Sequence, residues 1–189
     1  MTKQDLQPNL LTASGATVDI SDQLNERLAQ LGQEHCLFTC NGEGFALTIQ
    51  AAREVLIDEV PCPVPLAPPL LVGVINLRGE VLPLVRFDLL MGFESKPFLP
   101  EDQILVVQCG KVQMGLVVDR VREVRPIPPQ DIRPADQGAP RPHVQGTWNS
   151  GAGLVWVLDP GSLVQAAVGE MAKGFASFHA EQAATRLSS

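Results

Sequence analysis

The chain has 189 residues, a hydrophobic share of 45% and a formal net charge of −7. It is long enough to bury a core, and its hydrophobic share is too high for general disorder. An acidic chain repels the phosphates of nucleic acid and of anionic membranes, which excludes both as expected partners. Its longest apolar runs are interrupted well before the roughly 20 residues of a membrane-spanning helix, so we expect a soluble protein without direct membrane insertion.

The N-terminus and the cysteines indicate the compartment. Residues 1–20 lack the continuous apolar centre of a secretory signal, so we predict a cytoplasmic protein. The cysteines form no CxxC pair and no zinc-binding cluster with histidine. They are Cys36, Cys40, Cys62 and Cys109. We interpret them as free thiols and predict no metal site and no cofactor.

The N-terminal third changes from helical to β-type patterns. Residues 1–33 are predicted to form a flexible tail and a short helix with leucines at helical spacing, which ends at Gly32. From Cys36 onward, short apolar runs alternate with Gly, Asn, Asp and Pro, the pattern of an all-β barrel or sandwich. The expected strands lie near residues 36–40, 45–49, 55–57, 72–77, 81–87, 104–108, 112–118, 121–125 and 154–158.

Turns and prolines divide these strands. Asn41-Gly42 and residues 109–111 supply turn residues that accept positive φ. Two proline-rich segments, 61–69 and 126–142, are expected to be loops outside the sheet ladders, because proline lacks an amide donor. Two separate helices are predicted, at 161–168 and 170–187. Two consecutive sets of short strands indicate two small barrels, which hide strand edges.

Residues 72–93 carry the strongest local signal, a tight β-hairpin. Apolar strands flank a turn at Arg78, Gly79 and Glu80, where Gly79 can adopt φ values closed to other residues. Gly73 leaves room for another segment to approach closely, and Pro83 indicates an edge position or a bulge. The Arg78 guanidinium ends an apolar strand, where it needs an anionic or carbonyl partner.

This hairpin resembles the signature of CheW, the bacterial chemotaxis coupling family. The matching residues are Gly-Val-Ile-Asn-Leu-Arg-Gly at 73–79, Val-Leu-Pro-Leu-Val at 81–85 and Asp-Leu at 88–89. A second run, Gly-Leu-Val-Val-Asp-Arg-Val-Arg-Glu-Val at 115–124, is similar to the matching element of the family's other barrel. Residues 131–134 and 153–159 follow in the family's order, and the likeness covers about 34–168.

The resemblance implies an all-β fold with minor α content. It consists of two interlaced five-stranded SH3-like β-barrels, a short N-terminal helix and a C-terminal helix. The CheW-like domain would span 34–168, with barrel 1 at about 43–96 and barrel 2 at about 97–168 plus the N-terminal strand 34–41. Residues 169–189 would form the C-terminal helix and tail.

The resemblance also implies a function in two-component signal transduction. The chain would be a non-catalytic adaptor that couples the cytoplasmic tip of methyl-accepting chemoreceptors to the regulatory domain of a CheA-type histidine kinase. Family receptors occupy a groove between the barrels, while other faces bind the kinase. The matching groove residues here are Cys36, Ile49, Ala52, Val55 and Val121. Glu54 and Arg78 match an ion pair beside that groove, and Gly73, Asn76 and Gly79 are structural residues of the hairpin.

The chain departs from the family at several positions. Cys36 and Ala52 are smaller than the usual apolar residues, which predicts a shallower groove. The loop 137–151, with Pro140, His143 and Trp148, departs from the family pattern. The long N-terminal segment and proline-rich linkers resemble CheW-type proteins of pilus-based twitching or phototaxis systems. Control of flagellar chemotaxis and of these other motilities therefore both stay open.

Two other functions remain in competition. A scaffold or decoy would bind the kinase without coupling a receptor. A barrel that binds a small ligand or single-stranded nucleic acid is disfavoured by the acidic charge and by the few aromatic residues available for stacking. His35, His143 and His179 neighbour no nucleophile motif, so we expect no enzyme.

Overall fold

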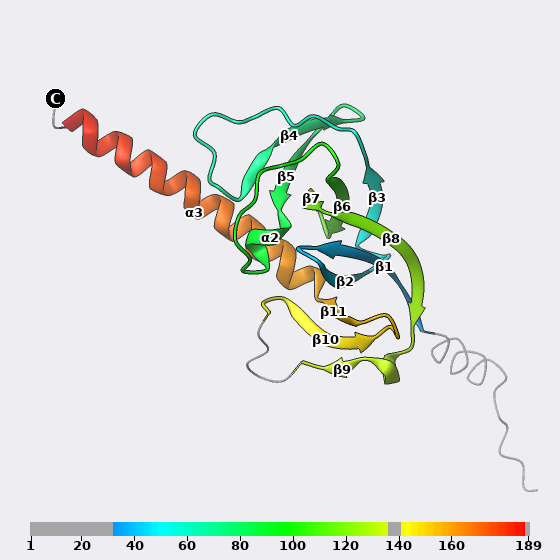
Figure 1. Cartoon of the computed structure of the whole chain (residues 1–189). Helices are drawn as coiled ribbons and strands as arrows, with labels where there is room; N and C mark the ends of the chain where they lie inside the picture. The colour runs from blue at the N-terminus through cyan, green and yellow to red at the C-terminus, as the bar shows by residue number, and fades with distance from the viewer. Residues whose placement is uncertain (1–31, 136–140, 188–189) are drawn as a thin grey trace, which may run out of the picture.

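The computed structural model describes residues 32–135 and 141–187, drawn in colour in Figure 1. The predicted N-terminal tail and short helix lie outside the described residues. The elements are, in chain order, β1 (Gln33–Cys40), β2 (Glu43–Thr48), β3 (Ala52–Leu56), β4 (Leu71–Leu77), β5 (Glu80–Arg86), α2 (Phe87–Leu90), β6 (Gln103–Cys109), β7 (Val112–Val118), β8 (Arg120–Ile127), the 3-10 turn η1 (Pro129–Asp131), β9 (Arg133–Pro134), β10 (Val144–Asn149), β11 (Leu154–Leu158) and α3 (Pro160–Leu187).

The strands form two sheets, which confirms the mostly β fold with a C-terminal helix. One sheet has six strands in the order β8-β1-β2-β11-β10-β9, and the other has five in the order β3-β6-β7-β5-β4. Each sheet contains one parallel pair, β2 with β11 and β5 with β7. The first sheet has six strands instead of the predicted five because the short β9 pairs with β10.

The boundary predicted between the barrels, at residues 96 and 97, does not match the sheets. β2 was predicted in barrel 1 but pairs with β1 and β11 in the six-stranded sheet. β6 and β7 were predicted in barrel 2 but belong to the five-stranded sheet. The strands β3 to β7 form one sheet and are inserted between β2 and β8 of the other, so a single division of the chain does not separate the sheets.

Two local predictions were also wrong, and the edge position expected for Pro83 holds only on the side of β7. Residues 144–149 form β10 within the predicted loop, because Trp148 and Gly146 are buried there. Pro126 and Pro134 lie inside β8 and β9, which are the two edge strands of the sheet, where a missing amide donor is tolerated. Pro83 lies in β5 between β4 and β7, and the pairing with β7 begins one residue later, at Leu84.

The C-terminal region is one helix instead of two. α3 continues for 28 residues through Gly169, because a helix-interior glycine costs only about 1 kcal/mol and does not by itself end a helix. Its first turns lie near α2 and β6 at the centre of the molecule, and the rest of the helix extends away from the sheets (Figure 1). Gly174 lies so close to Pro68 that an added Cβ would meet the proline Cβ at 2.3 Å. Within the described ranges, no helix has the length and apolarity needed to cross a membrane.

A central core joins the two sheets. Its aromatic centre is formed by Phe38 of β1, Phe45 of β2 and Phe87 of α2, which are at most 1% exposed. Their ring centroids lie 4.9–5.7 Å apart. Side chains of β5, β6, β7 and α3 complete this cluster, while each sheet also has a smaller core of its own. The sheets therefore form one packed unit.

Glu43 fixes the start of β2 to neighbouring segments. Its carboxylate pairs with the guanidinium of Arg141 and accepts a hydrogen bond from Trp156 Nε1 at 2.8 Å. The same guanidinium lies 4.1 Å from the ring centroid of Phe93. Because Phe93 packs on the central core, this network links the six-stranded sheet to the segment after α2.

The hairpin at residues 72–93 contains a two-residue turn. Leu77 pairs with Glu80, and the residues between them, Arg78 and Gly79, have φ of +53° and +92°. Positive φ at both positions is typical of a type I′ turn, whose twist matches that of the flanking strands. Asn76 Oδ1 accepts a hydrogen bond from the Gly79 amide at 2.8 Å, which closes the turn.

Gly73 allows a close backbone approach, as its position in the hairpin predicted. A Cβ added to Gly73 would lie 2.5 Å from the carbonyl oxygen of Cys62. Cys62 and Val74 exchange backbone hydrogen bonds of 2.8 and 2.9 Å, so the proline-rich segment covers the outer edge of β4.

We expect Gly73→Ala to lower the free energy of unfolding by about 1–3 kcal/mol, because the methyl group displaces the Cys62 backbone. Urea denaturation followed by circular dichroism measures this. Gly169→Ala is the matched control: its Cβ meets nothing within 4 Å, and alanine favours the helix. Equal stability of the Gly73→Ala and unmodified proteins would contradict the prediction.

Candidate functional site

β3 is an edge strand in which a bulge changes the direction of the side chains. Ala52 pairs with Val107 and Glu54 with Val106, so Arg53 is the extra residue. Val55 then pairs with Leu105. Cross-strand partners lie on the same face of a sheet. Ala52 and Val55 therefore share one face, although simple alternation would separate two residues three positions apart.

β8, the edge strand of the other sheet, repeats this arrangement. Residues 121–124 read Val-Arg-Glu-Val, against Ala-Arg-Glu-Val at 52–55. Val121 pairs with Phe38 and Glu123 with Leu37, so Arg122 is the extra residue. Val124 pairs with Cys36, which places Val121 and Val124 on the same face.

Together these two strands present an apolar surface that we name the β3–β8 face, made of Ala52, Val55, Val121 and Val124. Ala52 and Val121 are half-buried against the central core. Val55 and Val124 are 39% and 57% exposed. β3 and β8 lie on the same side of the molecule (Figure 1). Exposed apolar side chains at the rim of a core are typical of a protein-binding surface.

Sequence reasoning missed Val124. The bulge at Leu37 and Phe38 is the feature that turns Val124 to the same face as Val121, and it depends on pairing with β1. The sequence signal that could have identified Val124 is the repeat of Arg-Glu-Val, which occurs in both β3 and β8.

Two of the predicted groove residues differ from the other three in their surroundings. Cys36 is 4% exposed and belongs to the central core, so its side chain supports the β3–β8 face from beneath. Burial raises the pKa of the Cys36 thiol and raises that of Cys40 to about 12, so both thiols stay protonated at neutral pH. Ile49 is half-buried just after β2, and its amide donates to the Glu34 carbonyl at 3.1 Å. Contact of these residues with a receptor stays a prediction.

Glu54 and Arg78 form an ion pair next to this face. Arg78 Nη2 lies 2.7 Å from Glu54 Oε2, and the two side chains are 77% and 26% exposed. Glu54 points to the opposite face of β3 from Ala52 and Val55, because its partner Val106 belongs to the core inside the five-stranded sheet. A polar cavity lined by Arg53, Glu54, Arg78, Gln108 and Gln113 surrounds the pair. The ion pair thus borders the β3–β8 face without lying in it.

His35 is a buried polar residue next to Cys36. Its side chain is 1% exposed, and its Nδ1 donates to the Gln33 carbonyl at 2.6 Å. Its Nε2 has no hydrogen-bond partner among the described residues. Arg125 is its cross-strand neighbour on β8. Burial lowers the pKa of His35 below its ordinary value of 6.5, an effect that the Gln33 hydrogen bond partly offsets.

The two β-sheets share one core, and an edge strand of each sheet contributes to a common apolar face. These features define a protein-binding adaptor module. The family model for the CheW-like domain matches residues 34–168. The chain belongs to the CheW-like domain family.

Individual relatives agree with this family. The chain is 34% identical over 109 residues to the chemotaxis protein CheW of Rhizobium meliloti (strain 1021), which covers 58% of this chain and 70% of that protein. It is 25% identical over 107 residues to the chemotaxis protein CheW of Bacillus subtilis (strain 168), covering 57% and 69%. The crystal structure of the scaffolding protein TtCheW from Thermoanaerobacter tengcongensis matches with a TM-score of 0.63 and 25% identity, over 68% of this chain and 89% of that one. The predicted class, a chemosensory adaptor of the CheW type, is confirmed.

We expect Arg78→Ala to leave stability almost unchanged, with a loss of about 0–1 kcal/mol, because exposed ion pairs contribute little. Partner binding should weaken by more than this loss explains. Urea denaturation and a binding titration of the same sample separate the two effects, and Arg53→Ala, an exposed residue of the same polar cavity, is the control. If the loss of stability of Arg78→Ala accounted for all of its loss of partner binding, a role of Arg78 in recognition would be contradicted.

We expect the free energy of unfolding to fall as the pH decreases below 6.5, the ordinary histidine value. In that range the unfolded chain binds a proton at His35 that the folded chain does not, so acid favours unfolding until the folded pKa is passed. His35→Leu should flatten the dependence between about pH 7.5 and 5, measured by urea denaturation. Burial also lowers the pKa of His143, so His143 contributes a part of the pH dependence of stability that remains in the His35→Leu protein. If the free energy of unfolding changed equally with pH in the unmodified and His35→Leu proteins, His35 would not be the cause of the pH dependence.

Proposed function

We propose that this chain couples a methyl-accepting chemoreceptor to a CheA-type histidine kinase, and so controls motility in chemotaxis, twitching or phototaxis. The observation that carries the proposal is the β3–β8 face, where one bulge in each sheet turns two apolar residues toward the same side. An adaptor that binds two partners raises their effective concentration for each other. It acts by binding alone, without a catalytic step.

The β3–β8 face suits the helical tip of a receptor. An amphipathic helix presents an apolar stripe of similar spacing, and its polar flanks need charged groups beside the apolar surface. Glu54 and Arg78 supply both signs of charge on the opposite face of the edge strand β3, at the border of the apolar surface. Ala52 is smaller than a typical apolar anchor, which favours a receptor with a larger side chain opposite it.

We assign the kinase regulatory domain to a second apolar surface, formed by the segment that follows β3 and by the start of β5. Val60 and Val81 are 85% and 72% exposed there, and Ile57 is 60% exposed. A cavity of about 560 Å³, lined mainly by apolar residues, adjoins them. Its lining residues are Asp58, Glu59, Val60, Pro61, Pro63, Val72, Phe98 and Pro100. A regulatory domain with an apolar patch and basic surroundings would complement Asp58 and Glu59.

If the two surfaces bind different partners, substitutions on one surface should weaken binding of one partner only. Val124→Asp should abolish binding of a receptor cytoplasmic fragment but keep kinase binding, because it buries a charge only in the first interface. Val60→Asp should do the reverse. Val168→Asp, an exposed valine on α3, is the control and should retain both. Calorimetric titration against each partner, encoded near this chain's gene, measures the affinities.

The same titrations of the unmodified protein distinguish an adaptor from a decoy. Binding of the kinase with no detectable binding of any receptor fragment would identify a decoy, an outcome that the small residues Cys36 and Ala52 would explain. No binding of either partner by the unmodified protein would refute the proposed function.

The proposed role needs no metal and places the protein in the cytoplasm, where the receptor tip and kinase are exposed. Among the described residues, no cluster of three or more His, Cys, Asp or Glu side chains is arranged to hold a metal ion. The four cysteines are free thiols in the described structure, and two of them, Cys36 and Cys40, are buried.

A further inference from the structure

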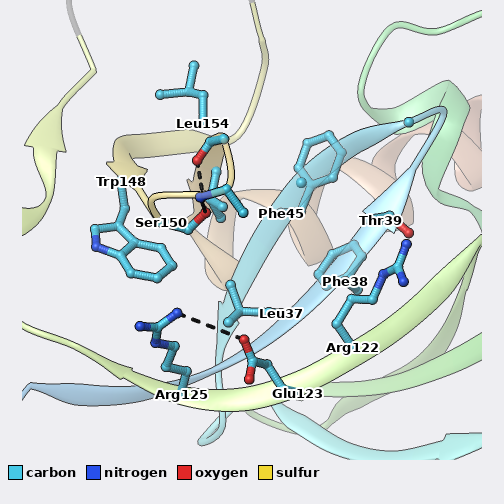
Figure 2. A pocket seen from close by; sticks show the side chains of 15 residues that line it. Leu37, Phe38, Thr39, Phe45, Arg122, Glu123, Arg125, Trp148, Ser150 and Leu154 are labelled. Carbon is cyan, nitrogen blue, oxygen red and sulfur yellow. Dashed lines mark hydrogen bonds and ion pairs between the residues drawn. The ribbon is translucent and has the colours of Figure 1, made fainter.

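A pocket opens on the other face of β8 from the β3–β8 face. It lies between β8 and the hairpin of β10 and β11, where Figure 2 shows Glu123 and Arg125 opposite Trp148 and Ser150. Its volume is about 390 Å³. Pockets of this size hold one small ligand or one or two side chains of a partner.

The floor and one wall of the pocket are apolar. Leu37 lies at the floor, where the buried Phe38 and Phe45 border the pocket with their rings turned into the central core. Trp148, Leu154 and Val155 line the side of the hairpin. Trp148 is only 7% exposed, so its ring is held in place by the core of the six-stranded sheet. A rigid aromatic wall of this kind binds apolar side chains without a large entropic cost.

The rim of the pocket is cationic. Arg122 and Arg125 both line it, against a single carboxylate, Glu123. Arg125 is engaged, with its guanidinium 5.2 Å from the centroid of Trp148 and 4.0 Å from Glu123. Arg122 is exposed and forms no ion pair with any described carboxylate. On a chain with a net charge of −7, this rim is a local site for a negative group.

The edge of β8 offers a further contact. β8 pairs with β1 alone, so among the described strands its other edge has no partner. An unpaired edge can hydrogen-bond the backbone of an extended segment. Because Glu123 and Arg125 point away from Val121 and Val124, a partner in the pocket leaves the β3–β8 face free.

We propose that this pocket is a second binding site, which takes an extended segment of a partner protein carrying a carboxylate next to an apolar or aromatic side chain. The apolar side chain enters between Leu37 and Trp148, and the carboxylate pairs with Arg122. The proposal goes beyond receptor and kinase coupling, and neither the receptor nor the kinase assignment depends on it.

The test uses the full chain and the peptide acetyl-Gly-Asp-Phe-Asp-Leu-Gly-amide as probe. The chain has two tryptophans, so the Trp148 indole N–H signal in a ¹H–¹⁵N spectrum is identified by its loss in Trp148→Phe. We expect this signal to shift saturably at peptide concentrations up to about 1 mM. The Asn analogue of the peptide and the Arg122→Ala variant should each bind roughly ten-fold more weakly, since each loses a charge-assisted hydrogen bond. Arg120→Ala changes an exposed arginine of the same strand outside the pocket, and should bind like the unmodified protein.

Four results would overturn the proposal. Three come from the peptide titration: no shift of the Trp148 signal, equal binding of the Asp and Asn peptides, and unchanged binding by Arg122→Ala. An equal shift with sodium phosphate would show a site for simple anions and also overturn the assignment to a peptide. Because Arg122 is exposed, its removal should not unfold the chain, and circular dichroism verifies this. The experiment contains neither receptor nor kinase, so its failure leaves the proposed function unaffected.

Discussion

The packing of Phe38, Phe45 and Phe87 is the interaction on which the rest of the structure depends. Phe38 and Phe45 come from the six-stranded sheet, and Phe87 follows β5 of the other sheet. Their contacts fix the distance and angle between the sheets, because packed aromatic rings tolerate little displacement. β3 and β8 belong to different sheets, so an apolar face made from both exists only while this core holds them together.

Bulges at the two sheet edges serve recognition. A regular edge strand would alternate its side chains and present one apolar residue where each bulged strand presents two. The extra residue is an arginine in both strands, Arg53 and Arg122, so the same irregularity adds a cation and discourages edge-to-edge aggregation. Edge protection and partner binding thus use the same local geometry.

Sequence reasoning was accurate where the determinants are local. The turns at Asn41-Gly42 and Arg78-Gly79 follow from residues that accept positive φ, and most strands follow from short apolar runs. β10 was missed because its apolar residues are sparse and its neighbours include Pro140 and Gly151. The barrel boundary could not be predicted, because it depends on pairings distant in the chain, such as β2 with β11. The orientation of Val124 depends on the distant pairing of β1 with β8, and its only local signal was the Arg-Glu-Val repeat shared with β3. Glu54 and the groove residues were identified from the resemblance to the CheW family, because residue matches to a family carry information on contacts between distant parts of the chain.

The interlaced order of strands also limits how the protein forms and diversifies. The five-stranded sheet uses β3 to β7, which are consecutive in the chain. In the six-stranded sheet, β1 pairs with β8 and β2 with β11, so this sheet is complete only after the chain has been synthesised to Leu158. The six-stranded sheet cannot be cut out, duplicated or exchanged between genes as a contiguous piece, because β3 to β7 are inserted between its strands β2 and β8. Because the β3–β8 face uses strands of both sheets, recombination that preserves it has to move the two sheets together, and a change of the partner bound there has to arise by substitution on β3 and β8.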